Sequence, residues 1–185
     1  MFKIVEVSDV IRIPPSMFGG DLEKVVKSLL KENYEDSVYE DLGYVIKVLD
    51  FDFNPVGKLV PSDGGSYHEV KFRLLVFTPE LHELVEGEVV EVESFGCFVR
   101  VGPIDALLHV SQITDDYMSF NEVEGTLIGK ESHKVIRKSD IVRARIVAVS
   151  IGKGGVGDKV GITTRQPFLG KLEWIEEEVK KSRRS

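Results

Sequence analysis

The sequence contains very little cysteine and no long uninterrupted apolar segment. One cysteine, Cys97, in 185 residues excludes an intrachain disulfide framework and a zinc site built from several cysteines. No segment approaches the roughly 20 consecutive apolar residues that span a bilayer. The first residues also lack the apolar block and the cleavage site of a secretory signal peptide. We therefore expect a reducing, intracellular setting, with the chain in the cytoplasm and without a membrane partner.

The sequence also lacks the residue patterns that catalysis and cofactor binding require. The segment Gly152–Gly157 matches the Gly-x-Gly-x-x-Gly pattern of dinucleotide sites. The residues after it predict a strand, however, rather than the helix that such a site needs. The histidines show no metal-ligand spacing, and neither a Ser/His/Asp arrangement nor a close pair of carboxylates is present. We predict a chain without catalytic residues, metal or cofactor.

Charge is distributed unevenly along an acidic chain. The formal net charge is −7, and residues 85–124 alone carry nine acids against one arginine. Residues 125–165 carry nine Lys or Arg side chains against three acids, a net charge of +6. A basic segment in an acidic protein predicts local binding of nucleic acid, with moderate affinity and strong salt dependence.

The first 80 residues follow the order strand, helix, strand, strand. β-Branched residues favour a strand over residues 2–13, which a pair of prolines ends. A helix is predicted to start after the N-cap residue Asp21, because apolar residues then recur at helical spacing, at Leu22, Val25, Val26, Leu29 and Leu30. Residues 43–53 and 70–76 have the composition and alternation of strands. This order predicts a small α+β layer.

The predicted layer resembles a truncated version of the RNA-recognition (RNP) fold. It lacks the Gly-Phe-Gly-Phe type of motif with which such domains stack RNA bases. We therefore predict that residues 1–80 form a docking domain rather than an RNA reader. Residues 54–66 contain two prolines and three glycines, which predict a loop or an irregular hairpin end. This loop is either a contact for a partner or an ordinary solvated loop.

Residues 81–185 show a second rhythm of short strand-like segments separated by glycine-marked bends. These segments are residues 87–93, 97–101, 106–110, 141–151 and 160–164. Residues 112–139 are predicted to be a long polar connection with a basic end. Five short strands with one long connection favour a five-stranded OB-fold barrel, and helical spacing of apolar residues after Leu169 predicts a terminal helix.

Alternation places the side chains of the second segment in this half on two faces. If Cys97, Val99 and Val101 fill the barrel, Phe98 and Arg100 lie outside. Exposed aromatic rings and nearby cations are the two requirements for binding single-stranded nucleic acid. We therefore predict an RNA-binding surface formed by Phe95, Phe98, Arg100, His109, Arg143, Arg145, Lys153 and Lys159. Alternatively, the two phenylalanines plug the barrel or a seam between the domains, and the histidine is an ordinary surface residue.

Two segments at the centre of the chain carry a resemblance to a known family. Phe95-Gly-Cys-Phe-Val99 and Asp105-Ala-Leu-Leu-His-Val-Ser111 resemble the S1 class of OB-fold RNA-binding domain. Almost from end to end, the chain is similar to the family of archaeal DNA-directed RNA polymerase E′ subunits, the larger of the two stalk subunits. Supporting segments include Val10-Ile-Arg-Ile-Pro-Pro15 and the tail Arg165-Gln-Pro-Phe-Leu-Gly-Lys-Leu-Glu-Trp-Ile175, which an S1 domain of another kind would not need.

The resemblance implies a role in transcription. It implies a non-catalytic subunit that docks near the clamp of the polymerase core, forms a heterodimer with the smaller, helical stalk subunit (called F), and binds nascent single-stranded RNA through its barrel. By position, Phe95, Phe98 and His109 match the aromatic and histidine positions of the S1 surface. The alternative is a free-standing S1 factor that binds RNA in translation or RNA decay.

Overall fold

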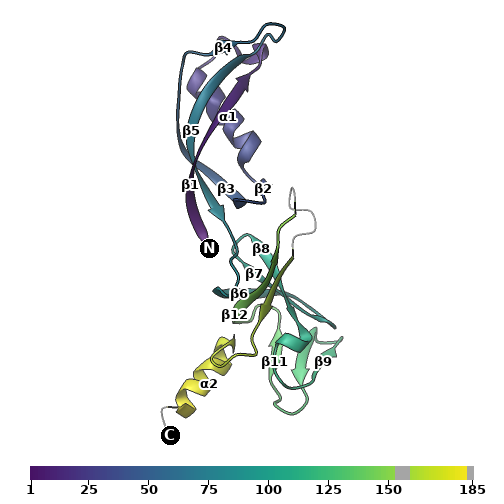
Figure 1. Cartoon of the computed structure of the whole chain (residues 1–185). Coiled ribbons are helices and arrows are strands. Elements are labelled where there is room, and N and C mark those ends of the chain that lie inside the picture. Colours follow the sequence, from purple (N-terminus) through teal and green to yellow (C-terminus); the bar gives the residue numbers. More distant parts are fainter. Residues whose placement is uncertain (153–158, 183–185) are drawn as a thin grey trace. The chain divides into compact units, whose positions relative to one another are not determined.

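The computed structural model describes residues 1–152 and 159–182, which divide into two compact units (Figure 1). The first unit is formed by Met1–Thr78, and the second begins at Pro79. Within this part of the chain, each unit combines β-sheet with one α-helix, so the predicted α+β class is confirmed. No helix among the described residues is long and apolar enough to cross a membrane.

An antiparallel sheet forms the first unit. Its long strands are β1 (Phe2–Ile13), β3 (Gly43–Phe53) and β5 (Ser66–Phe77), in the order β1-β5-β3 across the sheet (Figure 1). Two short strands, β2 (Val38–Tyr39) and β4 (Lys58–Leu59), pair with β3 and β5 respectively. The three strands that the sequence predicts are confirmed, and β5 is their central strand.

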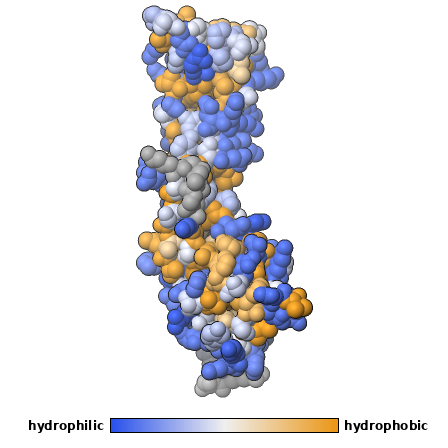
Figure 2. All heavy atoms as spheres, turned by 90° about the vertical axis from the view of Figure 1, so that its right-hand side faces the viewer, coloured by the Kyte–Doolittle hydropathy of each residue, from blue (hydrophilic) through white to orange (hydrophobic). Residues whose placement is uncertain are grey.

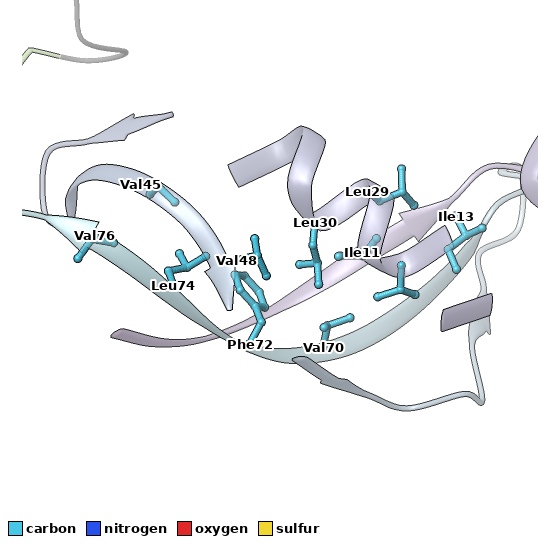
Figure 3. Close-up of a cluster of buried hydrophobic side chains, with 11 residues drawn as sticks. Ile11, Ile13, Leu29, Leu30, Val45, Val48, Val70, Phe72, Leu74 and Val76 are labelled. Carbon is cyan, nitrogen blue, oxygen red and sulfur yellow. The ribbon is translucent and has the colours of Figure 1, made fainter. Parts of the chain in front are cut away.

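The helix α1 (Leu22–Tyr34) packs on one face of this sheet (Figure 3). Asp21 caps the helix, since its carboxylate accepts a hydrogen bond from the Glu23 amide at 3.2 Å. Leu30 is fully buried, and truncating such a side chain to alanine costs about 2–5 kcal/mol of stability. The predicted apolar stripe is the face that packs, against the sheet residues Ile11, Ile13, Val45, Val48, Val70, Phe72, Leu74 and Val76.

A closed five-stranded barrel lies in the second unit. Its strands are β6 (Leu84–Glu93), β7 (Gly96–Val101), β8 (Ile104–His109), β12 (Ile141–Ser150) and β13 (Lys159–Thr163). The order is β13-β8-β7-β6-β12, and the pairing of β12 with β13 closes the ring. β13 runs parallel to β8, whereas the other neighbours are antiparallel. The predicted strands are confirmed, with boundaries that differ by no more than three residues.

Inward-pointing side chains of β7 fill the barrel. Cys97 and Val99 are buried and alternate with the outward-pointing Phe98 and Arg100, as the sequence predicts. Burial, and secondly the charge of Asp140, raise the pKa of the Cys97 thiol to about 12, so the thiol stays protonated at neutral pH. Cys97 is therefore a small apolar core residue.

The long connection between β8 and β12 contains more structure than its sequence predicts. Residues 112–139 include β9 (Met118–Asn121), β10 (Thr126–Gly129) and β11 (Val135–Arg137), which form an antiparallel sheet in the order β11-β10-β9. The predicted polar connection is thus a small folded sheet. Each of its strands has only three or four residues, so the apolar alternation is too short to detect in the sequence.

The chain then returns to the barrel through β14 (Gly170–Lys171) and the helix α2 (Leu172–Ser182). β14 pairs with β12, and the Lys171 ammonium lies 3.0 Å from a carboxylate oxygen of Asp140 and 2.9 Å from one of Glu173. Because a buried charge without partners is strongly destabilising, these carboxylates allow Lys171 to be buried and so fix this segment on the barrel.

Candidate nucleic-acid interface

Three ring side chains lie where β6 turns into β7 and where β8 ends. Phe95 occupies the turn with 45% of its surface exposed, Phe98 is half-buried, and His109 is exposed. The ring centroids of Phe95 and Phe98 are 6.1 Å apart, and the ring planes meet at 82°. Because the rings are nearly perpendicular, a base that stacks on one ring meets the edge of the other.

Gly96 makes this clustering possible at the start of β7. Its φ of 153° lies in a region that L side chains rarely adopt, and a Cβ atom there would lie 2.3 Å from the Leu108 carbonyl oxygen. Gly96 also pairs with His109 in the register of β7 and β8, so no side chain stands opposite the imidazole. The glycine thus brings the two strands together at the bend and leaves the His109 ring accessible.

A local hydrogen bond fixes the tautomer of His109. The Ser111 backbone N–H donates to Nδ1 of His109 at 3.2 Å, and the Ser111 hydroxyl oxygen lies 2.8 Å from the same nitrogen. A ring nitrogen that accepts from a backbone N–H carries no proton, so the neutral ring carries its proton on Nε2. The Nε2–H group can therefore donate to a phosphate oxygen or to an acceptor on a base.

Phe98 lies on the outer surface that β7 forms with β8 and β13. It pairs with Leu107 on β8, and Leu107 pairs with Gly161 on β13, which adds no side chain to the surface. Lys159 lies two residues before Gly161, at the exposed start of β13. We call this surface the barrel face and define it by Phe95, Phe98, Arg100, Leu107, His109 and Lys159.

Arg100 lies two residues after Phe98, but its charge is already paired. Its Nε and Nη2 groups donate to the two carboxylate oxygens of Asp105 on β8, at 2.9 and 3.1 Å. This hydrogen-bonded contact and the charge of Asp105 raise the pKa of Arg100, and Glu88 lies opposite on β6. A phosphate must therefore compete with Asp105 for the guanidinium group.

The structure does not bring Arg143 and Arg145 to the barrel face. Both project outward from β12, as predicted, but β12 is two strands from β7 through β6 and three strands through β8 and β13. Arg143 Nε donates to Glu86 at 2.7 Å, and Arg145 Nη1 donates to the His82 carbonyl at 3.0 Å. These arginines therefore form a separate surface, and Lys153 lies outside the described residues.

The barrel face combines stacking rings, a hydrogen-bond donor and few unpaired cations. Each base stacked on an aromatic ring stabilises binding by about 1–3 kcal/mol. Glu91 lies opposite Phe98 in the register of β6 and β7 and would repel a phosphate there. The geometry fits a single strand that turns its bases toward the rings. Among the residues that the structure describes, no group of three His, Cys, Asp or Glu side chains has the arrangement of a metal site.

The sequence-based prediction misses Leu107 of the barrel face and Asp105, the partner of Arg100. A turn signal marks the end of β7, just after Val101. Counting outward from this turn pairs Arg100 with Asp105 and Phe98 with Leu107. The hairpin register would therefore have found both residues.

Loop 54–66 of the first unit is a second candidate contact surface. Apolar residues reach the surface in both units (Figure 2), and in this loop they are Val56, Leu59 and Val60. Val56 and Leu59 are 76% and 72% exposed, respectively. Aliphatic side chains exposed to this degree in one loop are available to pack against a protein partner.

Polar contacts order this loop. The Asp63 carboxylate accepts from the Arg12 side chain at 2.7 and 2.6 Å and from the Tyr67 hydroxyl at 2.6 Å. The buried His68 places Nδ1 2.9 Å from the Asn54 carbonyl oxygen, so Nδ1 carries a proton and donates it. A loop that is already ordered loses less conformational entropy when it binds a partner.

Comparison with known proteins finds a domain family that matches part of each unit. Residues 8–64 match the SHS2 domain found in the N terminus of Rpb7p and Rpc25p, and residues 78–154 match the S1 RNA binding domain. The chain is 41% identical to DNA-directed RNA polymerase subunit Rpo7 of Sulfolobus acidocaldarius, over 98% of this chain and 99% of the relative. It is 42% identical to subunit Rpo7 of Saccharolobus solfataricus, over 95% of this chain and 97% of the relative. It is 32% identical to DNA-directed RNA polymerase II subunit RPB7 of Saccharomyces cerevisiae, over 79% of this chain and 86% of the relative.

Proposed function

Since the chain belongs to the family of DNA-directed RNA polymerase subunits that includes Rpo7 and RPB7, we propose that it docks on the polymerase core with the smaller stalk subunit and binds nascent single-stranded RNA through the barrel face. Membership of this family makes the chain a non-catalytic subunit of a polymerase complex. The smaller stalk subunit as partner, docking near the clamp and binding of the transcript are the proposed parts.

The pair of phenylalanine rings beside His109, one exposed and one half-buried, carries the RNA proposal. Phe95 and Phe98 lie within the segment that matches the S1 RNA binding domain, and the Nε2–H group of His109 is free to donate. With Arg100 paired to Asp105, the barrel face offers moderate affinity. Docking on a large complex beside the transcript would raise the effective RNA concentration and compensate for that moderate affinity.

Loop 54–66 supports the docking proposal. Its exposed valine and leucine side chains and its ordered polar network resemble an interface that is ready to bind. The sequence left open whether this loop is a contact or a solvated loop. We propose that it contacts the polymerase core.

Binding of labelled single-stranded RNA to the full chain tests the RNA proposal. We expect Phe98→Ala to weaken binding of an oligonucleotide of about 12 residues by about 5- to 150-fold, equivalent to the stacking of one base. Phe2→Ala, which removes an exposed ring from the first unit, should leave the affinity unchanged. Thermal melting checks that each variant is folded. Unaltered binding by a folded Phe98→Ala variant, at low and at high salt, would refute the assignment.

Purification of the affinity-tagged chain from native extract tests the partners. Recovery of the polymerase core with a second small subunit is expected from the end-to-end match with polymerase subunits. Recovery of ribosomal or RNA-decay proteins without polymerase would instead favour the free-standing S1 factor.

A further inference from the structure

A surface depression begins where the barrel face ends. Its lining includes Ser94, Ser111, Asp115, Tyr117 and Arg165. Ser94 directly precedes Phe95, and the Ser111 side chain and amide both contact the His109 ring nitrogen. The depression therefore adjoins the barrel face at Phe95 and His109.

The chain that follows β13 places Arg165 in this depression. The hydroxyl of the buried Thr164 donates to the Ile113 carbonyl at 2.6 Å, which ties this segment to the turn after β8. Arg165 forms an ion pair with Asp115 and donates from Nη1 to the Ser111 carbonyl at 3.4 Å. The Arg165 guanidinium group therefore contacts the same residue, Ser111, that fixes the His109 ring.

Tyr117 lies further along the same depression. It is 67% exposed, and the Lys130 ammonium lies 4.3 Å from its ring centroid. The adjacent Asp116 carboxylate accepts from the Ser132 amide and hydroxyl at 2.9 and 2.8 Å, which fixes the turn that carries Lys130. An exposed ring and an ammonium group, the two elements of a single-strand site, are therefore held together here.

We propose that the RNA path continues from the barrel face into this depression, where Arg165 contacts a phosphate and Tyr117 stacks a further base. Lys130 supplies a second cation beside that base. This inference rests on the proposed RNA-binding function and specifies where the RNA continues beyond the barrel face. The surface predicted from the sequence includes Arg143 and Arg145 on β12, whereas the residues that line the depression come from other segments of the chain.

Single-stranded RNA fits this depression better than a protein segment does. The depression is continuous with a surface of the same composition, and it repeats the order of ring and cation along the path. Asp115 opposes binding, because its carboxylate is largely exposed and neutralises Arg165. Removing that charge should therefore strengthen RNA binding, an effect that a purely structural role of this cluster would not produce.

The test compares two lengths of single-stranded RNA on the full chain. One oligonucleotide of about 4 residues covers the barrel face alone, and one of about 12 residues extends beyond it, within the known site sizes of OB folds. Tyr117→Ala should weaken binding of the longer RNA by about 3- to 10-fold, at the low end of base stacking. The same variant should change binding of the shorter RNA by less than about twofold, and Tyr117→Phe should retain wild-type affinity for both.

Asp115→Asn should change RNA affinity in the opposite direction from Tyr117→Ala. It should tighten binding of the longer RNA by about 2- to 5-fold, the range expected for an exposed ion pair. Tyr39→Ala, in the first unit, is the control for loss of a tyrosine ring. The inference is overturned if Tyr117→Ala affects both lengths equally or neither, if Asp115→Asn weakens binding or leaves it unchanged, or if Tyr117→Ala reduces only retention on the polymerase.

The two proposals can fail separately in this experiment. If Phe98→Ala weakens both oligonucleotides and Tyr117→Ala weakens neither, the barrel face binds RNA and the extended path is wrong. If Phe98→Ala has no effect on either length, the proposed function itself fails.

Discussion

Loop 54–66 and the barrel face both expose apolar side chains, but in different chemical surroundings. In the loop these side chains are aliphatic, at Val56 and Leu59. On the barrel face they include the rings of Phe95 and Phe98, beside an imidazole donor. Aliphatic groups gain mainly from exclusion of water, whereas a ring also stacks on the face of a base. The kind of apolar side chain, more than its exposure, separates the proposed protein contact from the proposed RNA contact.

The largest effect is expected from changing the loop. The double variant Val56→Ser with Leu59→Ser should reduce retention on the polymerase core about 30-fold or more, since even one interface anchor contributes about 2 kcal/mol or more. A quantitative pull-down of the core measures this change. RNA affinity should stay the same.

The matched control for the loop variant is Val123→Ser, which changes a valine that is 96% exposed in the second unit. This control should affect neither retention nor RNA affinity. Equal losses of docking and RNA binding in the loop variant would contradict the division of labour between the two regions.

A smaller effect on docking is expected when the loop loses its internal support. Asp63→Asn should lower retention about threefold, because a loosened loop loses more entropy on binding. Hydrogen exchange at the Gly65 amide, which donates to Asp63 at 3.1 Å, should become faster. Hydrogen bonds from Arg12, then Tyr67 and the Gly65 amide, hold the pKa of the Asp63 carboxyl well below its usual range.

The depressed pKa of Asp63 also predicts how the loop responds to pH. A lowered folded-state pKa gives stabilisation that is present above the unfolded-state pKa near 3.8 and is lost as the pH falls through the folded-state value. Protection of the Gly65 amide, corrected for intrinsic exchange, should therefore be equal at about pH 5 and pH 7. Weaker protection at about pH 5 than at about pH 7 would show that another group, which titrates between these values, orders the loop.

On the barrel face, freeing a cation should strengthen RNA binding without changing docking. Asp105→Asn removes the carboxylate that occupies Arg100 and should tighten RNA binding about 2- to 5-fold. Fluorescence anisotropy measures the change, and Glu122→Gln is the control for the loss of one exposed acid. Weaker binding by Asp105→Asn would mean that the ion pair itself shapes the site.

The smallest effect is expected on the far side of the barrel. Arg143→Ala should change RNA affinity by less than about twofold, because Arg143 pairs with Glu86 and lies two strands from Phe98. A larger loss, measured by the same anisotropy assay, would show that RNA reaches β12 and would confirm the path that the sequence pattern predicts.

Long elements with regular alternation could be predicted from the sequence. The strand over residues 2–13 and the helix after Asp21 are confirmed because each repeats its apolar spacing several times. The sheet of β9, β10 and β11 was missed because each strand repeats that spacing at most once or twice. Burial of Ile136 on β11 depends on neighbouring strands rather than on its local pattern.

The sequence predicted which side chains of the candidate site point out of the barrel, but not which residues they contact. Alternation correctly placed Phe98 and Arg100 outside the barrel. It could not show that Arg143 meets Glu86, which is 57 residues earlier in the chain. Contacts of this range depend on which strands pair and where the ring closes, and a local pattern contains neither.

The strand pairings also set an order of assembly on the ribosome. β1 finds its last partner at Phe77, whereas the ring of the barrel closes only when Thr163 reaches Arg145. The 86 residues between Phe77 and Thr163 take roughly 4–17 s to synthesise at about 5–20 residues per second. A nascent chain can therefore offer its first folded unit for assembly before the second unit has formed.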